Sequence, residues 1–254
     1  MIGIFDSGSG GMSVAREIIK ILPREKFFFF ADNAHCPYGE KSREYIEDRA
    51  RFITRFLLDK GADIIVVACN TATAAAIATL RKEFAPLKFI GMEPAVKPAA
   101  LGTKSGVIGV LATAGTLKGS KYLNTKSTVD SGIKIVEHVG KGFVELVERG
   151  VLDGPEAERT VRESIEPLLK AGADTIVLGC THYPFLIAPI SRIAGPGVSI
   201  IDPAPSVARH LKNVMEAEGL LKNDGAPSEG NPDIELYSSG EPLSLERIFH
   251  LIYQ

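Results

Sequence analysis

The chain has little of several features that mark large protein classes. Its 254 residues include no tryptophan and only three cysteines, at positions 36, 69 and 180. A sparse, odd-numbered set of cysteines is not a disulfide framework, so a reducing cytoplasm is the simplest setting. The formal net charge is only −2. Because no basic excess is available to neutralise phosphates, we expect no nucleic-acid partner.

Long apolar segments are also missing. The longest stretch without an acidic residue, lysine, arginine or histidine, Ile64–Leu80, is short for a membrane span and is interrupted by Asn70, Thr71 and Thr73. Met1 leads directly into the strand-like IGIF, without the basic start and apolar segment of a signal peptide. We therefore expect a cytoplasmic protein with no membrane partner.

The chain does contain an internal repeat that ends in a cysteine each time. Residues 61–71 read GADIIVVACNT and residues 172–182 read GADTIVLGCTH, so Cys69 aligns with Cys180. A second pair, IGIFDS at 2–7 and IGVLAT at 108–113, supports a duplication. An apolar, β-branched run that ends in a thiol is typical of a buried parallel strand with a reactive side chain at its carboxyl end. The repeat predicts two similar lobes whose thiols flank a single substrate.

Strand-like and helix-like segments alternate along the chain, which indicates an α/β fold with parallel sheets and crossover helices. We expect two similar parallel-sheet α/β domains that face each other across a cleft and are related by a pseudo-two-fold axis. Residues 1–95 and 206–254 form the first expected domain, and residues 96–205 form the second. Residues 223–232, rich in glycine, proline and polar side chains, indicate a surface loop or edge hairpin.

The strands and helices can be placed from periodicity and turn residues. The expected strands are Ile2–Phe5, Phe27–Ala31, Ile64–Ala68, Lys88–Gly91, Gly106–Leu111, Ile133–Glu137, Thr175–Leu178 and Ser199–Ile201. The expected helices are Ser13–Leu22, Arg43–Lys60, Ala72–Phe84, Leu117–Leu123 and Val207–Glu218, with further helices before Leu169.

Ligands of such sheets bind beyond the carboxyl ends of strands, where Asp6, Cys69, Thr113 and Cys180 all fall. A single buried cysteine is usually a small hydrophobic residue, but two at matched ends of a repeat favour a shared chemical role. Each thiol also precedes an expected helix, the first capped by Thr71 or Thr73 and the second opened by Pro184. Helix N-termini favour thiolate, so we expect lowered pKa values for both thiols.

Other site chemistries find less support in the sequence. Cys69, Cys180 and His182 offer possible zinc ligands, but no CxxC or HxxxH pair accompanies them, and we expect no metal site. The DSGSGG segment at 6–11 matches neither a Walker A loop nor a dinucleotide fingerprint, which leaves a tight turn or an anion cradle. His182 is either a structural residue or a proton carrier. Glutamates 145 and 148 are by default a solvated helix face.

Four segments together resemble the glutamate racemases, cofactor-independent enzymes that make D-glutamate for bacterial peptidoglycan. They are DSGSGG at 6–11, ADNAHCPYG at 31–39, ACNTATA at 68–74 and GCTHYP at 179–184. The resemblance implies a homodimer without added cofactor, with Cys69 and Cys180 as the two bases. It further implies that a set of polar residues contacts glutamate or assists catalysis, namely Asp6, Ser7, Tyr38, Gly39, Asn70, Thr71, Thr181 and His182, with Asp32 as a supporting residue.

The resemblance is weakest at 139–148, where this chain reads VGKGFVELVE and family members often read something like ACPLFVPLVE. The final glutamate aligns as Glu148, the family's proton-transfer partner near the second thiol, although Glu145 remains an alternative. By resemblance, Cys180 with His182 and Glu148 takes the proton from L-glutamate, while Cys69 near Asp6 takes it from D-glutamate.

Racemisation removes a proton from one face of the α-carbon and returns one to the other, which a facing pair of thiols suits. The developing carbanion needs hydrogen-bond donors in a dry cleft, and the hydroxyls of Ser7, Thr71, Thr113 and Thr181 are suitable. Two alternatives remain open: an aspartate or hydantoin racemase with the same two cysteines, and a two-lobed amino-acid-binding protein.

Overall fold

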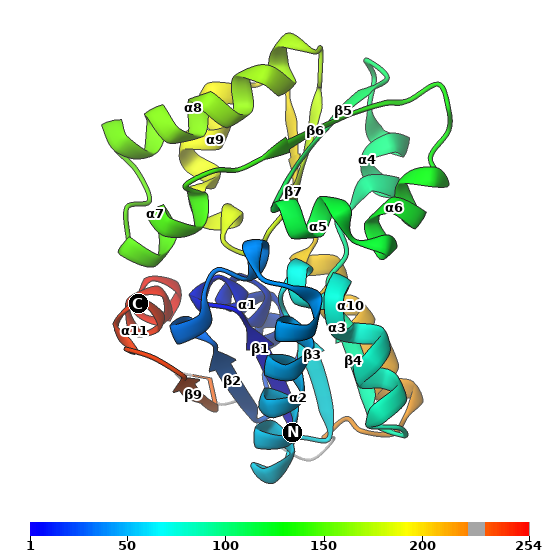
Figure 1. The fold of residues 1–254 in the computed structure, drawn as a ribbon, viewed down its shortest axis with the longest axis vertical. Helices are drawn as coiled ribbons and strands as arrows, with labels where there is room; N and C mark the ends of the chain where they lie inside the picture. Colours follow the sequence, from blue (N-terminus) through cyan, green and yellow to red (C-terminus); the bar gives the residue numbers. More distant parts are fainter. Residues whose placement is uncertain (223–231, 254) are drawn as a thin grey trace.

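The computed structural model describes residues 1–222 and 232–253, which form two lobes, each built around a sheet of parallel strands (Figure 1). The first sheet has the order β4-β3-β1-β2-β9 and the second the order β6-β5-β7-β8. Every strand pair in both sheets is parallel. The strands of the first sheet are β1 (Ile2–Asp6), β2 (Phe27–Ala31), β3 (Ile64–Val67), β4 (Lys88–Gly91) and β9 (Ile234–Ser238); those of the second are β5 (Val107–Ala112), β6 (Lys134–Val139), β7 (Thr175–Gly179) and β8 (Ser199–Ile201).

Helices cover the faces of both sheets, which explains why the central strands are apolar on both sides. In the first lobe these are α1 (Met12–Ile21), α2 (Arg43–Asp59), α3 (Asn70–Glu83), α10 (Ala204–Ala217) and α11 (Leu243–Tyr253). In the second lobe they are α4 (Val96–Gly102), α5 (Ala114–Lys118), α6 (Ser120–Ser127), α7 (Phe143–Arg149), α8 (Pro155–Lys170) and α9 (Ile187–Ala194). Short 3-10 turns complete the connections at η1 (Ser9–Gly11), η2 (Asn33–His35), η3 (Tyr38–Glu40) and η4 (Tyr183–Leu186).

The two lobes repeat the same topology, as the sequence predicted. The order β4-β3-β1-β2 of the first sheet matches the order β8-β7-β5-β6 of the second, and only β9 is additional. Ile2 pairs with Ile64 in the first lobe, and the aligned residues Ile108 and Thr175 pair in the second. The duplication therefore preserves the register of the strands as well as their order.

Some expected elements differ from the structure. The helix expected at 117–123 is two helices, α5 and α6, because Gly119 between them is extended at φ −68° and ψ 136°. Helix α10 begins at Ala204, earlier than expected, and α4, α9, β9 and α11 were not placed individually. The loop or hairpin expected at 223–232 lies, except for Pro232, outside the described residues. The exact domain boundaries at 95 and 206 stay a prediction.

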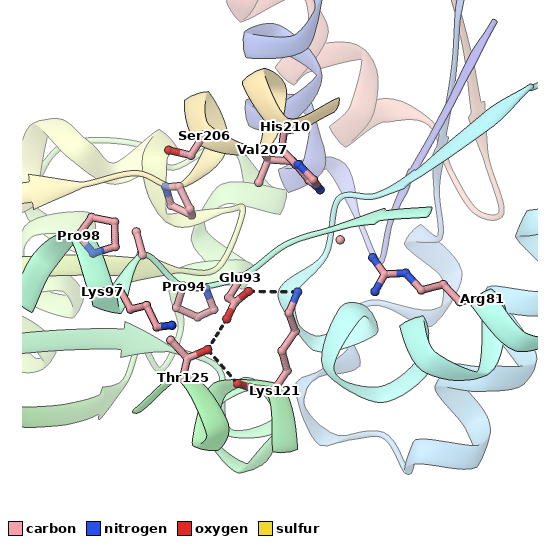
Figure 2. Close-up of a pocket in the computed structure, with 13 residues that line it drawn as sticks. Arg81, Glu93, Pro94, Lys97, Pro98, Lys121, Thr125, Ser206, Val207 and His210 are labelled. Atoms are coloured by element: carbon pink, nitrogen blue, oxygen red, sulfur yellow. Dashed lines mark hydrogen bonds and ion pairs between the residues drawn. The ribbon is translucent and has the colours of Figure 1, made fainter. Parts of the chain in front are cut away.

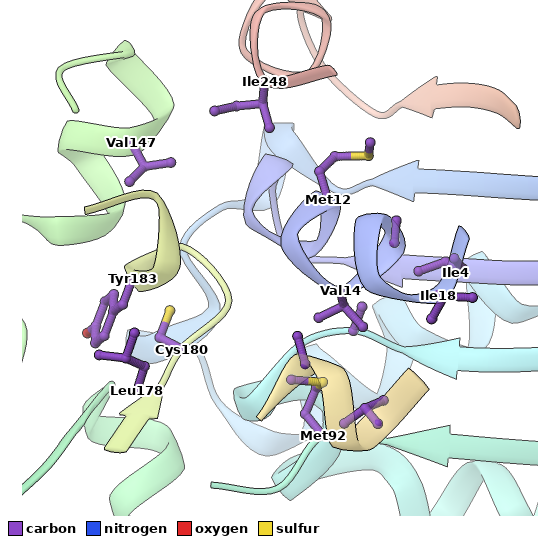
Figure 3. Packing of buried hydrophobic residues seen from close by; sticks show 14 of the residues in the cluster. Ile4, Met12, Val14, Ile18, Met92, Val147, Leu178, Cys180, Tyr183 and Ile248 are labelled. Carbon is purple, nitrogen blue, oxygen red and sulfur yellow. The ribbon is translucent and has the colours of Figure 1, made fainter. Parts of the chain in front are cut away.

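Among the residues that the structure describes, buried side chains form three clusters, one of which crosses between the lobes. That cluster includes Met12 and Val14 of α1 together with Leu178 of β7, and it contains the second cysteine of the repeat, Cys180. Figure 3 shows Cys180 near Leu178 and Tyr183 on the second-lobe side of this packing, with Met12 and Val14 on α1 of the first lobe. A continuous core thus ties the lobes together directly beside the cysteine.

Over residues 1–222 and 232–253, no helix is both long enough and apolar enough to cross a membrane.

Equivalent glycines in the two central strands let a helix approach each sheet closely. A Cβ added at Gly3 of β1 would lie 3.2 Å from Leu57 Cβ of α2, and one added at Gly109 of β5 would lie 2.9 Å from Leu168 Cδ1 of α8. We expect Gly109→Val to destabilise the protein by about 1–3 kcal/mol through overpacking. Urea unfolding followed by circular dichroism measures this.

Gly197 provides a matched control, because a Cβ added there meets nothing within 4 Å. Gly197→Val should change the free energy of unfolding by less than about 0.5 kcal/mol. Equal stability of the two variants would show that the close approach of α8 to β5 does not constrain residue 109.

Candidate active site

The carboxyl ends of strands from both lobes meet around a small cavity that contains both repeated cysteines. Its free space for the centre of a water molecule is only about 10 Å³, enough for about one water. Among the predicted substrate contacts, all except Asp6 line it, and Pro37 and Val144 are additional. The lining residues are Ser7, Pro37, Tyr38, Gly39, Cys69, Asn70, Thr71, Thr113, Val144, Cys180, Thr181 and His182.

Cys69 follows β3 and is itself the N-cap of α3. Its sulfur accepts a hydrogen bond from the backbone N–H of Ala72 at 3.4 Å, and its thiol donates to Ser7 Oγ at 3.7 Å. The expectation that Thr71 or Thr73 caps this helix was therefore wrong. The expected lowering of the Cys69 pKa was also wrong, because burial and then the nearby Asp6 raise the pKa of this thiol well above its usual value. The helix N-terminus does not offset the desolvation of a buried thiolate.

Asp6 is fully buried and contacts two residues that line the cavity, Ser7 and Thr181. Its carboxylate accepts hydrogen bonds from the backbone N–H of Gly11 at 2.7 Å and from Thr181 Oγ1 at 3.3 Å. Burial raises the pKa of Asp6, although His182 and the hydrogen bond from Cys69 act in the opposite direction. Asp6 thus adjoins the Cys69 thiol without lining the cavity.

On the opposite side, Cys180 follows β7 and leads into a chain of polar contacts. His182 Nδ1 lies 3.8 Å from Cys180 Sγ, and His182 Nε2 lies 2.7 Å from Glu148 Oε1. Burial alone would lower the pKa of His182, but its contacts with Cys180 and Glu148 raise it well above the usual value. Pro184 opens a 3-10 turn, η4, rather than the α-helix expected there.

Glu148 receives donors from both lobes at one carboxylate oxygen. Besides His182, the backbone N–H and the Oγ of Ser9 donate to Oε1 at 2.7 and 2.9 Å. Although burial opposes ionisation, the bond with His182 and the other donors lower the pKa of Glu148 to about 2. Glu145, the alternative on the same helix, is exposed, and no hydrogen bond or ion pair is described for it. Of the two glutamates considered from the sequence, Glu148 is the one that lies beside His182.

Ser9 was not among the predicted site residues, although it lies in the DSGSGG segment. A Cβ added at Gly10 would lie 2.3 Å from His182 Nδ1, and one added at Gly8 would lie 2.4 Å from Glu148 Oε1. The glycines therefore give His182 and Glu148 the space to approach this loop. The anions that its backbone N–H groups bind are two of the protein's own carboxylates, Glu148 at Ser9 and Asp6 at Gly11.

Hydroxyl groups from both lobes meet near Cys69. Thr71 Oγ1 lies 2.8 Å from Thr113 Oγ1, which in turn lies 2.9 Å from Thr116 Oγ1. Thr113 also caps α5 by accepting from the backbone N–H of Thr116 at 3.2 Å. Thr116 was missed, although its place three residues after Thr113 is the spacing of a helix N-cap contact and could have indicated it.

Asn70 is the least satisfied polar residue of the cavity. Its side chain is buried, and neither its Nδ2 nor its Oδ1 has a hydrogen-bond partner among the described residues. A buried unpaired polar atom costs about 1–3 kcal/mol. A polar ligand in the cavity would supply the missing partners.

Tyr38, which lines the cavity, is held in place by a hydrogen bond to Asp32. Its hydroxyl donates to Asp32 Oδ2, and Asp32 also accepts a bidentate pair from Arg49 at 2.8 and 2.9 Å. Although burial opposes ionisation, the bonds from Arg49 and Tyr38 hold the pKa of Asp32 below its usual value. Asp32, the supporting residue of the sequence analysis, therefore positions Tyr38 and does not line the cavity.

Two other features have the chemistry of a binding site. Within the described ranges, the possible metal-ligand atoms that cluster are those of Cys36, Glu148 and His182, and not the combination of Cys69, Cys180 and His182 considered from sequence.

A pocket of about 370 Å³ lies where the lobes join (Figure 2). Its polar lining includes Glu93 with Arg81, Lys97, Lys121 and His210. It contains no cysteine and none of the predicted site residues, so we assign the active site to the smaller cavity between the thiols.

Comparison with known proteins identifies the family. The model of the Asp/Glu/hydantoin racemase family matches residues 2–211. The chain is 51% identical to the glutamate racemase of Methylococcus capsulatus over 244 residues, 96% of this chain and 88% of that protein. Among solved structures it is similar to glutamate racemase RacE1 of Bacillus anthracis, with a TM-score of 0.86 and 34% identity over 98% of this chain and 91% of that one.

It is also similar to the glutamate racemase of Francisella tularensis, solved in complex with D-glutamate. The TM-score is 0.83 and the identity 29%, over 100% of this chain and 93% of that one. A structure called an aspartate racemase homologue, from Pyrococcus horikoshii, reaches a TM-score of 0.54 at 18% identity and shares the fold alone, over 85% of this chain and 98% of that one. From its sequence and its structure, the chain belongs to the Asp/Glu/hydantoin racemase family and, within it, to the glutamate racemases.

Proposed function

We propose that the chain interconverts L- and D-glutamate with Cys69 and Cys180 as the two bases, without an added cofactor, and so supplies D-glutamate for peptidoglycan. The observation that supports this most directly is the pair of thiols at equivalent strand ends. Both line one small cavity, and each lies beside its own polar partners. Family membership and the glutamate-bound relative support glutamate as the substrate.

For L-glutamate, Cys180 is the base in this proposal. Because Glu148 raises the pKa of His182 and so favours its protonated form, a positive charge lies 3.8 Å from the Cys180 sulfur. The thiolate takes the α-proton, so that the Cα–H bond breaks and an S–H bond forms. The electron pair stays on the substrate carbon as a carbanion.

Cys69 then acts as the acid on the opposite face. The raised pKa of its buried thiol keeps the proton on sulfur until the carbanion forms. Transfer of that proton gives D-glutamate and leaves a thiolate beside Asp6, and proton exchange resets the pair. In the reverse direction Cys69 is the base and Cys180 the acid.

Polar groups of the cavity hold the substrate in this proposal. Asn70 offers an unpaired amide, and Thr71, Thr113 and Thr181 offer hydroxyls on both sides. With space for about one water, the cavity must open to admit glutamate and excludes most water when it closes again. A dry site strengthens the hydrogen bonds that stabilise the carbanion.

Assembly and location are parts of the same proposal. We infer a homodimer from the family resemblance, which sedimentation equilibrium would contradict if it found only a 27.3-kDa species. All three cysteines are free thiols, and the mechanism requires two of them to be reduced, which suits the cytoplasm. Turnover of L-aspartate in preference to L-glutamate would point instead to the aspartate racemases.

Replacing either catalytic thiol tests the division of labour. Cys69→Ser and Cys180→Ser should both lose nearly all racemisation of glutamate, measured by circular dichroism, because a hydroxyl is far less acidic than a thiol and each turnover needs both faces. A glutamate with a leaving group on its β-carbon should separate them, because elimination needs one base only. We expect Cys69→Ser to eliminate from the L-form and Cys180→Ser from the D-form.

The unmodified protein with each enantiomer is the control for that experiment. Loss of elimination from both enantiomers in both variants would reject one thiol per face. A reversed preference would exchange the two roles.

Glu148→Gln tests the polar chain behind Cys180, with Glu145→Gln on the same helix as the matched control. Because Glu148 raises the pKa of His182, its removal should make the imidazole titrate at lower pH, as measured by NMR of the His182 ring. Turnover of L-glutamate should fall by about 10²-fold or more, as for loss of acid–base assistance. Glu145→Gln should leave both quantities near their original values.

The raised pKa of His182 also determines how the stability of the folded protein depends on pH. The stabilising contribution of the His182 contacts is fully present below the unfolded pKa, about 6.5, and is lost as pH rises through the folded value. A Glu148→Gln variant with unchanged His182 titration would contradict the proposed relay.

A further inference from the structure

A second pocket, of about 310 Å³, lies behind the wall of the substrate cavity. Pro37 and Val144 line both spaces and so separate them. His182 lines only the substrate cavity, whereas Glu148 lines only the second pocket. The 2.7 Å contact between His182 Nε2 and Glu148 Oε1 therefore joins the two spaces across the wall formed by Pro37 and Val144.

The charge of the second pocket favours a cation. Glu145, Glu148 and Glu241 contribute three carboxylates, and no lysine, arginine or histidine occurs among its described lining residues. The other lining residues are Asn33, Ala34, Cys36, Pro37, Val144, Gly240 and Ser244. Cys36 adds a thiol to the acidic surface, and this thiol is not used in the proposed racemisation.

Three different ligand atoms converge at the wall. Cys36 Sγ, Glu148 Oε1 and His182 Nε2 all lie within 4.8 Å of one another. A tetrahedral ion with ligands at about 2.0–2.3 Å holds neighbouring ligand atoms about 3.3–3.8 Å apart. The 2.7 Å contact between His182 Nε2 and Glu148 Oε1 would therefore widen slightly. Sulfur, nitrogen and oxygen together suit a borderline-soft divalent ion such as Zn²⁺.

We propose that Cys36, Glu148 and His182 form an inhibitory binding site for Zn²⁺ or a similar thiophilic divalent cation, which enters through the second pocket. Binding releases the thiol proton of Cys36 and the proton on His182 Nε2 to solvent. The ion then occupies the nitrogen and oxygen that form the 2.7 Å contact between His182 and Glu148 in the free protein, so this contact behind Cys180 is lost. The inhibition rests on the proposed racemase function, whereas the binding of the ion does not.

The site differs from a metal captured by the catalytic thiols. Cys36 does not line the substrate cavity, and Cys69 and Cys180 do not belong to the ligand group. Zinc at the proposed site should therefore lower the maximal rate even at saturating glutamate. Zinc between the catalytic thiols would instead be displaced by substrate.

Cobalt binding provides a test that does not depend on activity. Titration of the full-length protein with Co²⁺ should give a thiolate-to-cobalt charge-transfer band in the protein itself and in the Cys69→Ser and Cys180→Ser variants. The band should be absent from Cys36→Ser. Its persistence in Cys36→Ser, or its loss from both catalytic variants, would overturn the proposed site.

Zinc inhibition, measured with free Zn²⁺ fixed by a metal buffer, tests the consequence. Cys36→Ser should racemise glutamate at nearly the original rate and need at least about tenfold more Zn²⁺ for half-inhibition, since even supporting residues of metal sites contribute 10–100-fold to affinity. Unchanged sensitivity would overturn the inhibitory role. If Cys36→Ser does not fold, the charge-transfer bands of Cys69→Ser and Cys180→Ser still test the site. Loss of the band from both variants would overturn it. A protein that binds Co²⁺ through Cys36 but never racemises glutamate would refute the proposed function alone.

Discussion

One carboxylate oxygen, Glu148 Oε1, contacts residues of both lobes and lies beside the site between them. Glu148 Oε1 from the second lobe accepts two hydrogen bonds from Ser9 of the first lobe and contacts His182 beside Cys180. Hydrogen bonds to a charged group contribute about 1.5–3 kcal/mol each. The same oxygen therefore holds the lobes together on this side and contacts the imidazole next to the Cys180 sulfur.

The duplicated fold explains why the two thiols face each other, and the loops explain why they are not equivalent. Matching registers place Cys69 and Cys180 after β3 and β7, at corresponding places in the two sheets. Asp6 lies beside Cys69, whereas an imidazole and a carboxylate extend from Cys180. The proposed racemisation needs one base on each face of the substrate, and this arrangement gives each thiol its own polar neighbours. The strands therefore place the two thiols at equivalent positions, and the segments that follow the strands give the thiols different neighbours.

Much of this arrangement could be predicted from residues that follow one another in the sequence. Apolar runs such as Phe27–Ala31 indicated the buried strands, and the repeated cysteine indicated the shared site. The edge strand β9 was missed because its side chains are mostly half-buried and lack a clear pattern. Ser9 was missed because its partner, Glu148, is distant in sequence and belongs to the other lobe. The pKa of Cys69 was predicted in the wrong direction because sequence shows the helix start but not the depth of burial.

The central claim is that protons leave and arrive on opposite faces through different thiols. Incubation of L-glutamate with the protein in D₂O, followed by NMR at early times, tests this most directly. We expect D-glutamate to contain deuterium at the α-carbon, delivered by an exchanged Cys69, while the remaining L-glutamate keeps its hydrogen. Deuterium that appears in L-glutamate as fast as in D-glutamate, or D-glutamate that retains the original hydrogen, would show that one base serves both faces and would contradict the account.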